Sequence, residues 1–460
     1  VLVALILGGV IAFHVYTRPA RLRRMARERL TELAGAPVQV EQAQYSILQG
    51  LILNEVAVQD ATLPEDRPAL HVSTLILRPD LGALLRGRLA WDVVEMEDVS
   101  LDVRLDETNR WRFLQQVNLA EEKAGEAPQL MIHRAEVSLS GLTTEYGEAP
   151  PLDIKGVNVL VTPLGEGRGV RTRLWTERQQ FGRLNLQFHM QPSGERAEGT
   201  LSVTDLVVDA GLRDMLPSDL RKQWETFSPL YAQVEASAEF TWDANADPEV
   251  RVAGDVFLRD GQVNHPLLPY PVRSVYTDIH VDGRRFDATR FRAVAGEALL
   301  SGSARARLKD DGELEGELTV RAEGMRFDDR FIPMLPEDLK TLWVQVRPSG
   351  EVNVVAHLRA ASPLDRSDIF ADVELVDCAC ELPGMPIRLT GVKGGLKYAG
   401  RRLDFREISG KVAGGEVKVE QGFAELRDGG AFRIGIEANG LDLDMAAEKV
   451  TSPLVWTLAG

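Results

Sequence analysis

The residue types that build catalytic and metal centres are scarce in this sequence of 460 residues. It contains two cysteines and seven histidines, and no two histidines have the His-x-His or His-Glu-x-x-His spacing of a metal site. The Gly-x-Ser-x-Gly nucleophile elbow and the P-loop are both missing. We therefore expect a protein that is not an enzyme and that uses no metal or other cofactor.

Positive charge is in deficit as well. The chain carries 53 lysine and arginine residues against 69 aspartate and glutamate residues, a formal net charge of −16 at pH 7. Such a negative field repels phosphate polymers, so we expect no nucleic-acid partner. Residues 165–169 are glycine-rich, but they lack the third glycine of a dinucleotide-binding fingerprint, and we interpret them as a turn.

The two cysteines, Cys378 and Cys380, are separated by one residue in a run that reads as a strand. At the two-residue period of a strand both side chains lie on the same face. A disulfide across that spacing would be strained. We interpret both as small buried hydrophobic residues.

Helical periodicity is rare, and a period of two replaces it along most of the chain. The clearest alternation of apolar and polar residues covers residues 99–106, 184–188, 352–356, 417–420 and 432–437. Roughly twenty such runs, separated by turns that contain Gly, Asp or Pro, predict a mainly β protein.

A few short amphipathic helices are also expected. One is predicted over residues 20–34 and another near residues 108–118, and two more begin near Pro217 and Pro336, where proline suits the first helical turn. The last two each carry three apolar side chains on one face, so we expect them to lie flat against a sheet, either as structural caps or as lids that control access. These candidate lid residues are Leu216, Leu220, Trp224, Leu335, Leu339 and Trp343.

Segments in the second half of the sequence recur at intervals of roughly 118 residues. Residues 216–224 resemble residues 335–343, and Gly283–Asp287 resembles Gly400–Asp404. A third copy begins near the end of the sequence and breaks off, and the first residue is Val1 rather than Met. We therefore expect a piece of a longer chain that is built as a modular array.

The N-terminal residues 1–16 are apolar apart from His14. A bilayer requires about 20 such residues, and the small-residue cleavage site of a signal peptide does not follow. We expect a truncated, uncleaved membrane anchor. Six arginines between Arg18 and Arg29 come next, and the positive-inside tendency taken alone would place that side of the anchor in the cytoplasm.

The strands present a physical problem, because each has one apolar face that must be kept from water. Every fully buried Val or Leu contributes about 1.5–3 kcal/mol, whereas the net stability of a whole domain is about 5–15 kcal/mol. Helices are too few to cover the strands. The apolar faces must therefore pack against a second sheet, be enclosed in a barrel, or contact another apolar substance held in a curled sheet. A chain of linked repeats favours one long curled antiparallel sheet with a repeating groove. The candidate groove residues are Val99, Leu101, Val103, Leu105, Leu184, Leu186, Phe188, Val352, Val354, Ala356, Val417 and Val419.

The order of features near the N-terminus resembles that of a known family. The apolar anchor and basic helix lead into strand-like runs, a Leu-Leu-x-Gly-x-Leu segment at residues 84–89, a further strand at residues 94–103, and Asn-x-Trp at residues 109–111. In this order the chain resembles the AsmA-like superfamily of bacterial envelope proteins, the AsmA, TamB and YhdP type. The resemblance covers about 100 residues, and the repeats after residue 200 agree with the long β-arrays of that family.

The resemblance implies a bridge-like lipid carrier with a single-pass anchor in the inner membrane of a diderm bacterium and its bulk in the periplasm. Its expected partners are phospholipid, the inner membrane, and an outer-membrane or envelope protein contacted through a part of the chain beyond this sequence. The alternative is an envelope scaffold or an outer-membrane protein assembly factor made of dry β-sheets.

The domain organisation expected from these observations is a series of segments along the chain. They are a truncated transmembrane anchor at 1–17, a basic amphipathic helix at 18–35, an N-terminal AsmA-like β region at 36–125, a continuation of the β-groove at 126–200, a first repeat at 201–319, a second repeat at 320–436, and the start of a truncated third repeat at 437–460.

Overall fold

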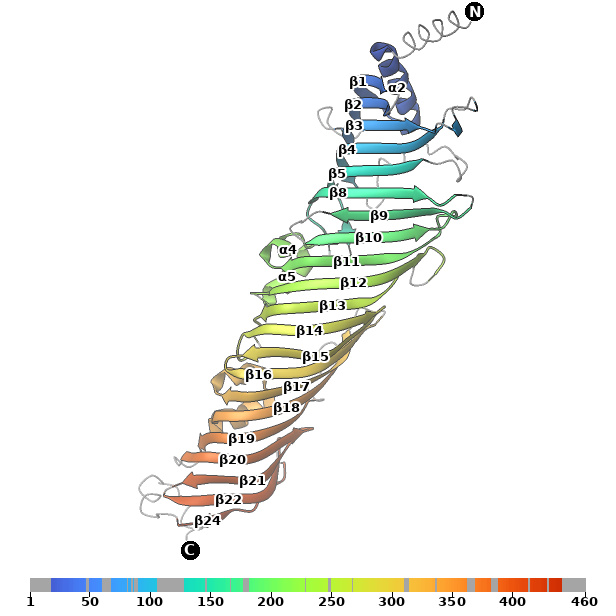
Figure 1. Cartoon of the computed structure of the whole chain (residues 1–460). Helices are drawn as coiled ribbons and strands as arrows, with labels where there is room; N and C mark the ends of the chain where they lie inside the picture. Colours follow the sequence, from blue (N-terminus) through green and yellow to red (C-terminus); the bar gives the residue numbers. More distant parts are fainter. Residues whose placement is uncertain are drawn as a thin grey trace, which may run out of the picture. The chain divides into compact units, whose positions relative to one another are not determined.

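The computed structural model shows a mainly β protein in which 22 of the described strands belong to one mostly antiparallel sheet. The structure describes residues 18–46, 49–59, 68–80, 82–83, 86, 90–105, 128–144, 147–165, 167–176, 182–227, 229–246, 250–266, 268–309, 314–335, 337–361, 369–381, 388–412, 414–427 and 430–440. The chain divides into two compact units, which are described separately. Figure 1 shows the strands of each unit stacked one after another in chain order.

Unit 1 comprises residues 1–223 and 234–254. It contains α2 (Pro19–Ala34), β1 (Val38–Ser46), β2 (Gly50–Val58), β3 (Leu70–Pro79), β4 (Trp91–Arg104), β5 (Gln129–Ser140), a separate hairpin of β6 (Thr143–Thr144) and β7 (Gly147–Glu148), β8 (Leu152–Pro163), β9 (Val170–Thr176), β10 (Arg183–Met190), β11 (Arg196–Val208) and α4 (Ala210–Asp214). Three further elements include residues of both units: α5 (Ser218–Thr226), β12 (Tyr231–Asp243) and β13 (Val250–Val263).

Unit 2 comprises residues 224–233 and 255–460. It contains β14 (Val272–Asp282), β15 (Arg285–Ala295), β16 (Ala298–Leu308), β17 (Leu314–Phe327), the 3₁₀ helix η2 (Asp329–Met334), α6 (Glu337–Val346), β18 (Ser349–Ala361), β19 (Ile369–Glu381), β20 (Arg388–Ala399), β21 (Arg402–Val412), β22 (Gly415–Glu425), β23 (Phe432–Ile434) and β24 (Glu437–Asn439). From β14 to β22 each strand pairs antiparallel with the next.

The prediction of an antiparallel sheet is confirmed for most of the strands, although β4 and β5 run parallel. The predicted curling of the sheet is corrected: in neither unit is the sheet strongly curled (Figure 1). Antiparallel strands in continuous register twist gently, and sharper bending enters only where a β-bulge breaks the register.

The helix predicted at residues 20–34 is confirmed as α2, which ends at Gly35 in the left-handed conformation that glycine favours. The two later helices are confirmed as α5 and α6. None of the helices that the structure describes is long and apolar enough to cross a bilayer. The anchor predicted at residues 1–17 and the helix predicted near residues 108–118 lie outside the described residues.

The recurring sequence segments occupy equivalent elements. Gly283 begins the turn between β14 and β15, and Gly400 begins the turn between β20 and β21, with φ angles of 57° and 55°. In each copy an aspartate follows a long strand and caps the next helical segment. Asp209 accepts hydrogen bonds from two backbone amides at the start of α4, and Asp328 accepts one from Arg330 at the start of η2.

Asparagine side chains bridge β-bulges at two places in the sheet. The backbone N–H of Arg134, a residue with a φ of 54°, donates to Asn158 Oδ1 over 3.2 Å. The backbone N–H of Gly324, with a φ of 70°, donates to Asn353 Oδ1 over 3.0 Å. At both bulges the pairing register shifts, so the side chain replaces the carbonyl partner that the displaced amide loses.

Burial within unit 1 predicts where its stability is concentrated. Leu53 is fully buried beneath α2, so we expect Leu53→Ala to lower the free energy of unfolding by about 2–5 kcal/mol, measured by urea denaturation. Leu299→Ala serves as the control, because Leu299 is 62% exposed and its loss should change stability by less than about 0.5 kcal/mol. Equal effects of the two substitutions would contradict this distribution of packing.

Candidate functional site

One face of the sheet in unit 2 is built from uncharged, almost entirely apolar side chains. Cross-strand partners share a face, so the register identifies its members: Leu300 pairs with Ala322, Ala322 with Val354, and Val354 with Val373. We call this surface the apolar face. It includes Ile279, Val281, Phe286, Ala288, Phe291, Ala293, Leu300, Gly302, Ala304, Ala306, Leu318, Val320, Ala322, Val352, Val354, Ala356, Leu358, Ala371, Val373, Leu375, Leu396, Leu403, Phe405, Ile408, Val417, Val419 and Ala424.

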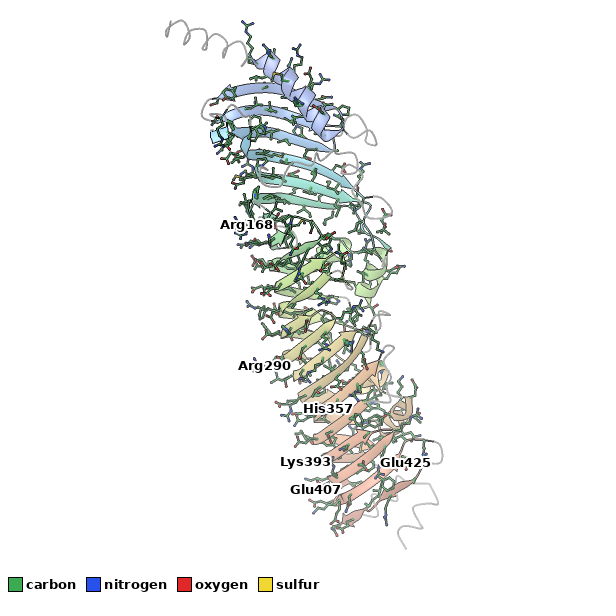
Figure 2. The ribbon with its side chains drawn as sticks, turned by 90° about the vertical axis from the view of Figure 1, so that its right-hand side faces the viewer. Arg168, Arg290, His357, Lys393, Glu407 and Glu425 are labelled. Carbon is green, nitrogen blue, oxygen red and sulfur yellow. The ribbon has the colours of Figure 1, made fainter. Side chains whose placement is uncertain are left out.

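The opposite face of the same strands is charged. Arg359 Nη2 lies 2.7 Å from Glu317 Oε1, and Arg406 Nη2 lies 3.1 Å from Asp372 Oδ1. Figure 2 shows Arg290, His357 and Lys393 among the side chains that extend from the sheet. The strands therefore carry charge on the face that remains in water and none on the other, as a period of two requires.

The sheet in unit 1 also has an apolar side, and α2 covers it at the first strands. Leu22, Ala26 and Leu30 of the helix pack against the face of β1, β2 and β3, where Leu53 and Val72 are almost completely buried. Cover by α2 decreases along the sheet, since Met96, Ile132, Val159 and Leu174 are only partly buried.

In unit 2 a helical segment covers one part of the apolar face. We call η2 and α6 together the lid segment. Their Phe331 and Trp343 are buried, with ring centroids 6.0 Å apart, and Phe327 of β17 lies 5.2 Å and 5.1 Å from these two rings. Beneath them lies the covered strip, defined by Met325, Val352, Cys378, Leu389, Val392 and Val412.

Polar contacts anchor the lid segment at its start. The Tyr270 hydroxyl donates to Asp328 Oδ2 over 2.7 Å, and Arg330 Nη2 lies 3.1 Å from the same carboxylate. The Arg330 guanidinium also stacks over the Tyr270 ring at 4.5 Å. Partial burial, together with the neighbouring carboxylate of Asp328, raises the pKa of Tyr270, so the hydroxyl keeps its proton for this bond.

Beyond the lid segment most of the apolar face of unit 2 is only partly buried, although Ala293 and Leu403 are buried. We call this part the open strip, defined by Leu318, Val320, Ala356, Leu358, Ala371, Leu396, Phe405 and Ala424. Small side chains are frequent beside it, with Gly302, Ala304 and Ala306 on β16 and Gly316 on β17. No second layer of described strands lies against it, because the described strands form the one large sheet and a two-stranded hairpin.

The candidate groove residues of unit 1 lie together on the apolar face of the sheet in that unit. The register aligns Leu101 with Val137, and Leu186 with Leu174 and Leu201. Val99 is buried near the α2 cluster, whereas the other candidates in this unit are partly exposed: Leu101, Val103, Leu105, Leu184, Leu186 and Phe188.

The candidate groove residues of unit 2 divide between the two strips. Val352 is fully buried in the covered strip, and Val417 packs partly buried against that cluster. Val354 borders both strips, while Ala356 lies in the open strip and Val419 is half-buried on the same face.

The candidate lid residues lie on or beside α5 and η2–α6. In the first copy Leu216, Leu220 and Trp224 are half-buried. In the second copy Trp343 is buried, Leu335 packs against the covered strip, and Leu339 is half-buried. The sequence did not identify Tyr270 and Phe331 as part of this arrangement, although the aspartate that recurs as Asp209 and Asp328 marks the start of both helical segments.

A hollow of about 1350 Å³ in unit 2 is lined by strands β17 to β22 and includes charged side chains. Arg321, Lys393 and Arg406 accompany the carboxylates of Glu323, Asp372, Glu374, Glu407 and Glu420. Several of these charges neutralise one another, as Arg406 does with Asp372, and the hollow is wide open. Its lining also includes residues of the apolar face, namely Ala322, Val354, Val373, Leu375 and Leu396.

Both cysteines are free, and Cys378 is buried on the apolar face as the sequence indicated, whereas Cys380 is only partly buried. No group of side chains suited to a metal ion occurs among the residues that the structure describes. Comparison with known protein families, with curated proteins and with solved structures finds no match to this chain.

The buried thiol gives a test of the cover over the apolar face. Burial raises the pKa of Cys378 to about 11, some two units above its ordinary value, which lowers its thiolate fraction at pH 7.5 by about 100-fold. We expect iodoacetamide to modify Cys378 far more slowly in the folded protein than after denaturation, as measured by peptide mass spectrometry. Rapid modification of the folded protein would show that the strip is not covered.

Proposed function

We propose that this protein is a non-enzymatic lipid carrier that conducts phospholipid along the apolar face of its sheet. The acyl chains lie on the open strip and the headgroups remain in water beyond its edge. An extended sheet face that is apolar, uncharged and without a second layer of described strands supports this proposal above all.

The energetics of the open strip favour an apolar occupant. Each Val, Leu or Phe side chain left facing water forgoes about 1.5–3 kcal/mol of burial. Over a few strands, the burial energy forgone by exposed side chains would equal the net stability of an ordinary domain, which is about 5–15 kcal/mol. Acyl chains provide the missing cover without polar groups that would need partners on the apolar face.

The sheet provides a path rather than a single pocket. Nine consecutive strands, β14 to β22, carry the apolar face in unit 2. At about 4.8 Å between strands they extend the path by about 40 Å. Small residues such as Gly302 and Ala304 leave room for a chain to slide without side chains that would trap it.

The setting of this activity follows from the resemblance to AsmA-like proteins. We propose that the protein is anchored in the inner membrane of a diderm bacterium, that its bulk is periplasmic, and that lipid moves toward the outer membrane with the help of an envelope partner. The alternative of a dry scaffold or assembly factor requires a second sheet packed on the first, and no described strand layer fills that place.

Two neighbouring residues on β18 give a matched test. Ala356 points to the open strip beside Val320 and Ala371, whereas Val355 lies on the charged face opposite Arg321. We expect Ala356→Asp to reduce co-purifying phospholipid at least severalfold, because a carboxylate on the apolar face would be desolvated by acyl chains. The bound lipid is measured by extraction and mass spectrometry.

Val355→Asp is the control, since its added carboxylate lies on the charged face, between Arg321 and Asp372, and not on the apolar face. It should retain the lipid content of the unmodified protein, and circular dichroism should show both variants folded. Equal lipid content in all three proteins, or no lipid in any of them, would sink the carrier proposal.

A further inference from the structure

The lid segment contains a buried hydrogen-bond donor without an acceptor. Trp343 is 9% exposed, and its indole Nε1 is buried with no partner. Among the described residues the other buried donor in this condition is Arg221 Nε, which lies on α5, the corresponding helix of the preceding copy. Buried donors are normally satisfied, so an unpaired one in each of the two helices requires an explanation.

The surroundings of Trp343 restrict what could pair with it. Its ring packs against Phe327 and Phe331, and the strip below contains Val352, Cys378 and other apolar side chains. A charged or strongly hydrated acceptor would be costly among these groups. A neutral carbonyl oxygen attached to a long apolar chain fits both the donor and the strip, and the acyl ester of a glycerolipid has this chemistry.

We propose that the Trp343 indole N–H donates a hydrogen bond to an acyl ester carbonyl of a bound lipid, and that the lid segment lifts from the covered strip to admit it. This inference rests on the proposed function, because it names the part of the lipid that a second strip of the same face recognises. The covered strip continues directly into the open strip, since Val352 and Val354 are adjacent on one face of β18.

Polar contacts at the start of the lid segment help to hold it against the sheet. Tyr270, Asp328 and Arg330 hold η2 to the preceding part of the chain. Trp343 of α6 packs against Phe327 and the apolar side chains of the covered strip, and an incoming acyl chain can replace these contacts. Lifting α6 would expose Val352 and Cys378 together.

The hydrogen bond is tested with two lipids that differ only in the carbonyl. The intact chain is stripped of lipid in detergent, and its affinity for dipalmitoyl phosphatidylcholine is compared with that for the dihexadecyl ether analogue. A neutral hydrogen bond corresponds to about fivefold in affinity. We expect the unmodified protein to favour the ester lipid by about this factor and Trp343→Phe to bind both lipids equally.

Trp175→Phe is the control, because Trp175 lies on strand β9 opposite Asn158 and Asn185, on the other face of the sheet. It should keep the ester preference. If the unmodified protein binds both lipids equally, or if Trp343→Phe keeps the preference, the inference is wrong although the carrier proposal stands. If neither lipid binds, both are wrong.

Opening of the lid segment can be measured separately, through the rate at which the thiol of Cys378 is alkylated. We expect Tyr270→Phe, which removes the hydroxyl bonded to Asp328, to raise the alkylation rate of Cys378 severalfold while the protein remains folded. Bound ester lipid should change that rate in the unmodified protein. An alkylation rate that neither Tyr270→Phe nor bound lipid alters would show that α6 does not lift, and would overturn the inference even if Trp343→Phe proves poorly folded.

Discussion

The sheet of this protein has one apolar face and no second layer of described strands to cover it, and the other features are responses to that constraint. At the first strands α2 supplies the cover, and in unit 2 the lid segment supplies it over a limited strip. Elsewhere in unit 2 the apolar face carries small side chains such as Gly302 and Ala304. Charge is confined to the opposite face, where ion pairs such as Arg359–Glu317 remain in water and contribute little to stability.

Partial cover gives the two strips different properties. Residues of the covered strip, such as Val352, are packed as tightly as a conventional core, and their contribution to stability should be that of a core. Residues of the open strip, such as Ala356, contribute less to folding and remain available to a ligand. Tightly packed and partly exposed apolar positions therefore lie next to each other on the same strand, and β17 and β19 carry bulges near the boundary between them.

Much of the fold could be predicted from the sequence because it follows from local periodicity. The alternation at residues 352–356 defined the strand and its two faces, and proline at 217 and 336 indicated where α5 and α6 begin. The division into strips could not be predicted, since Val352 and Ala356 have the same pattern and differ only in what packs above them. Nor could the parallel pairing of β4 with β5, which depends on a contact between distant segments rather than on either strand.

Nearly every strand bonds to the one that precedes it in the chain, so the contacts that define the sheet are short in sequence. Proteins of low contact order fold quickly, and a growing β-array can add hairpins as they leave the ribosome instead of waiting for a distant partner. Because each strand pairs with its neighbour in the sequence, whole hairpins can be gained or lost in evolution without changing the pairing of the other strands. The length of such a sheet can therefore change without any change in how its remaining strands pair.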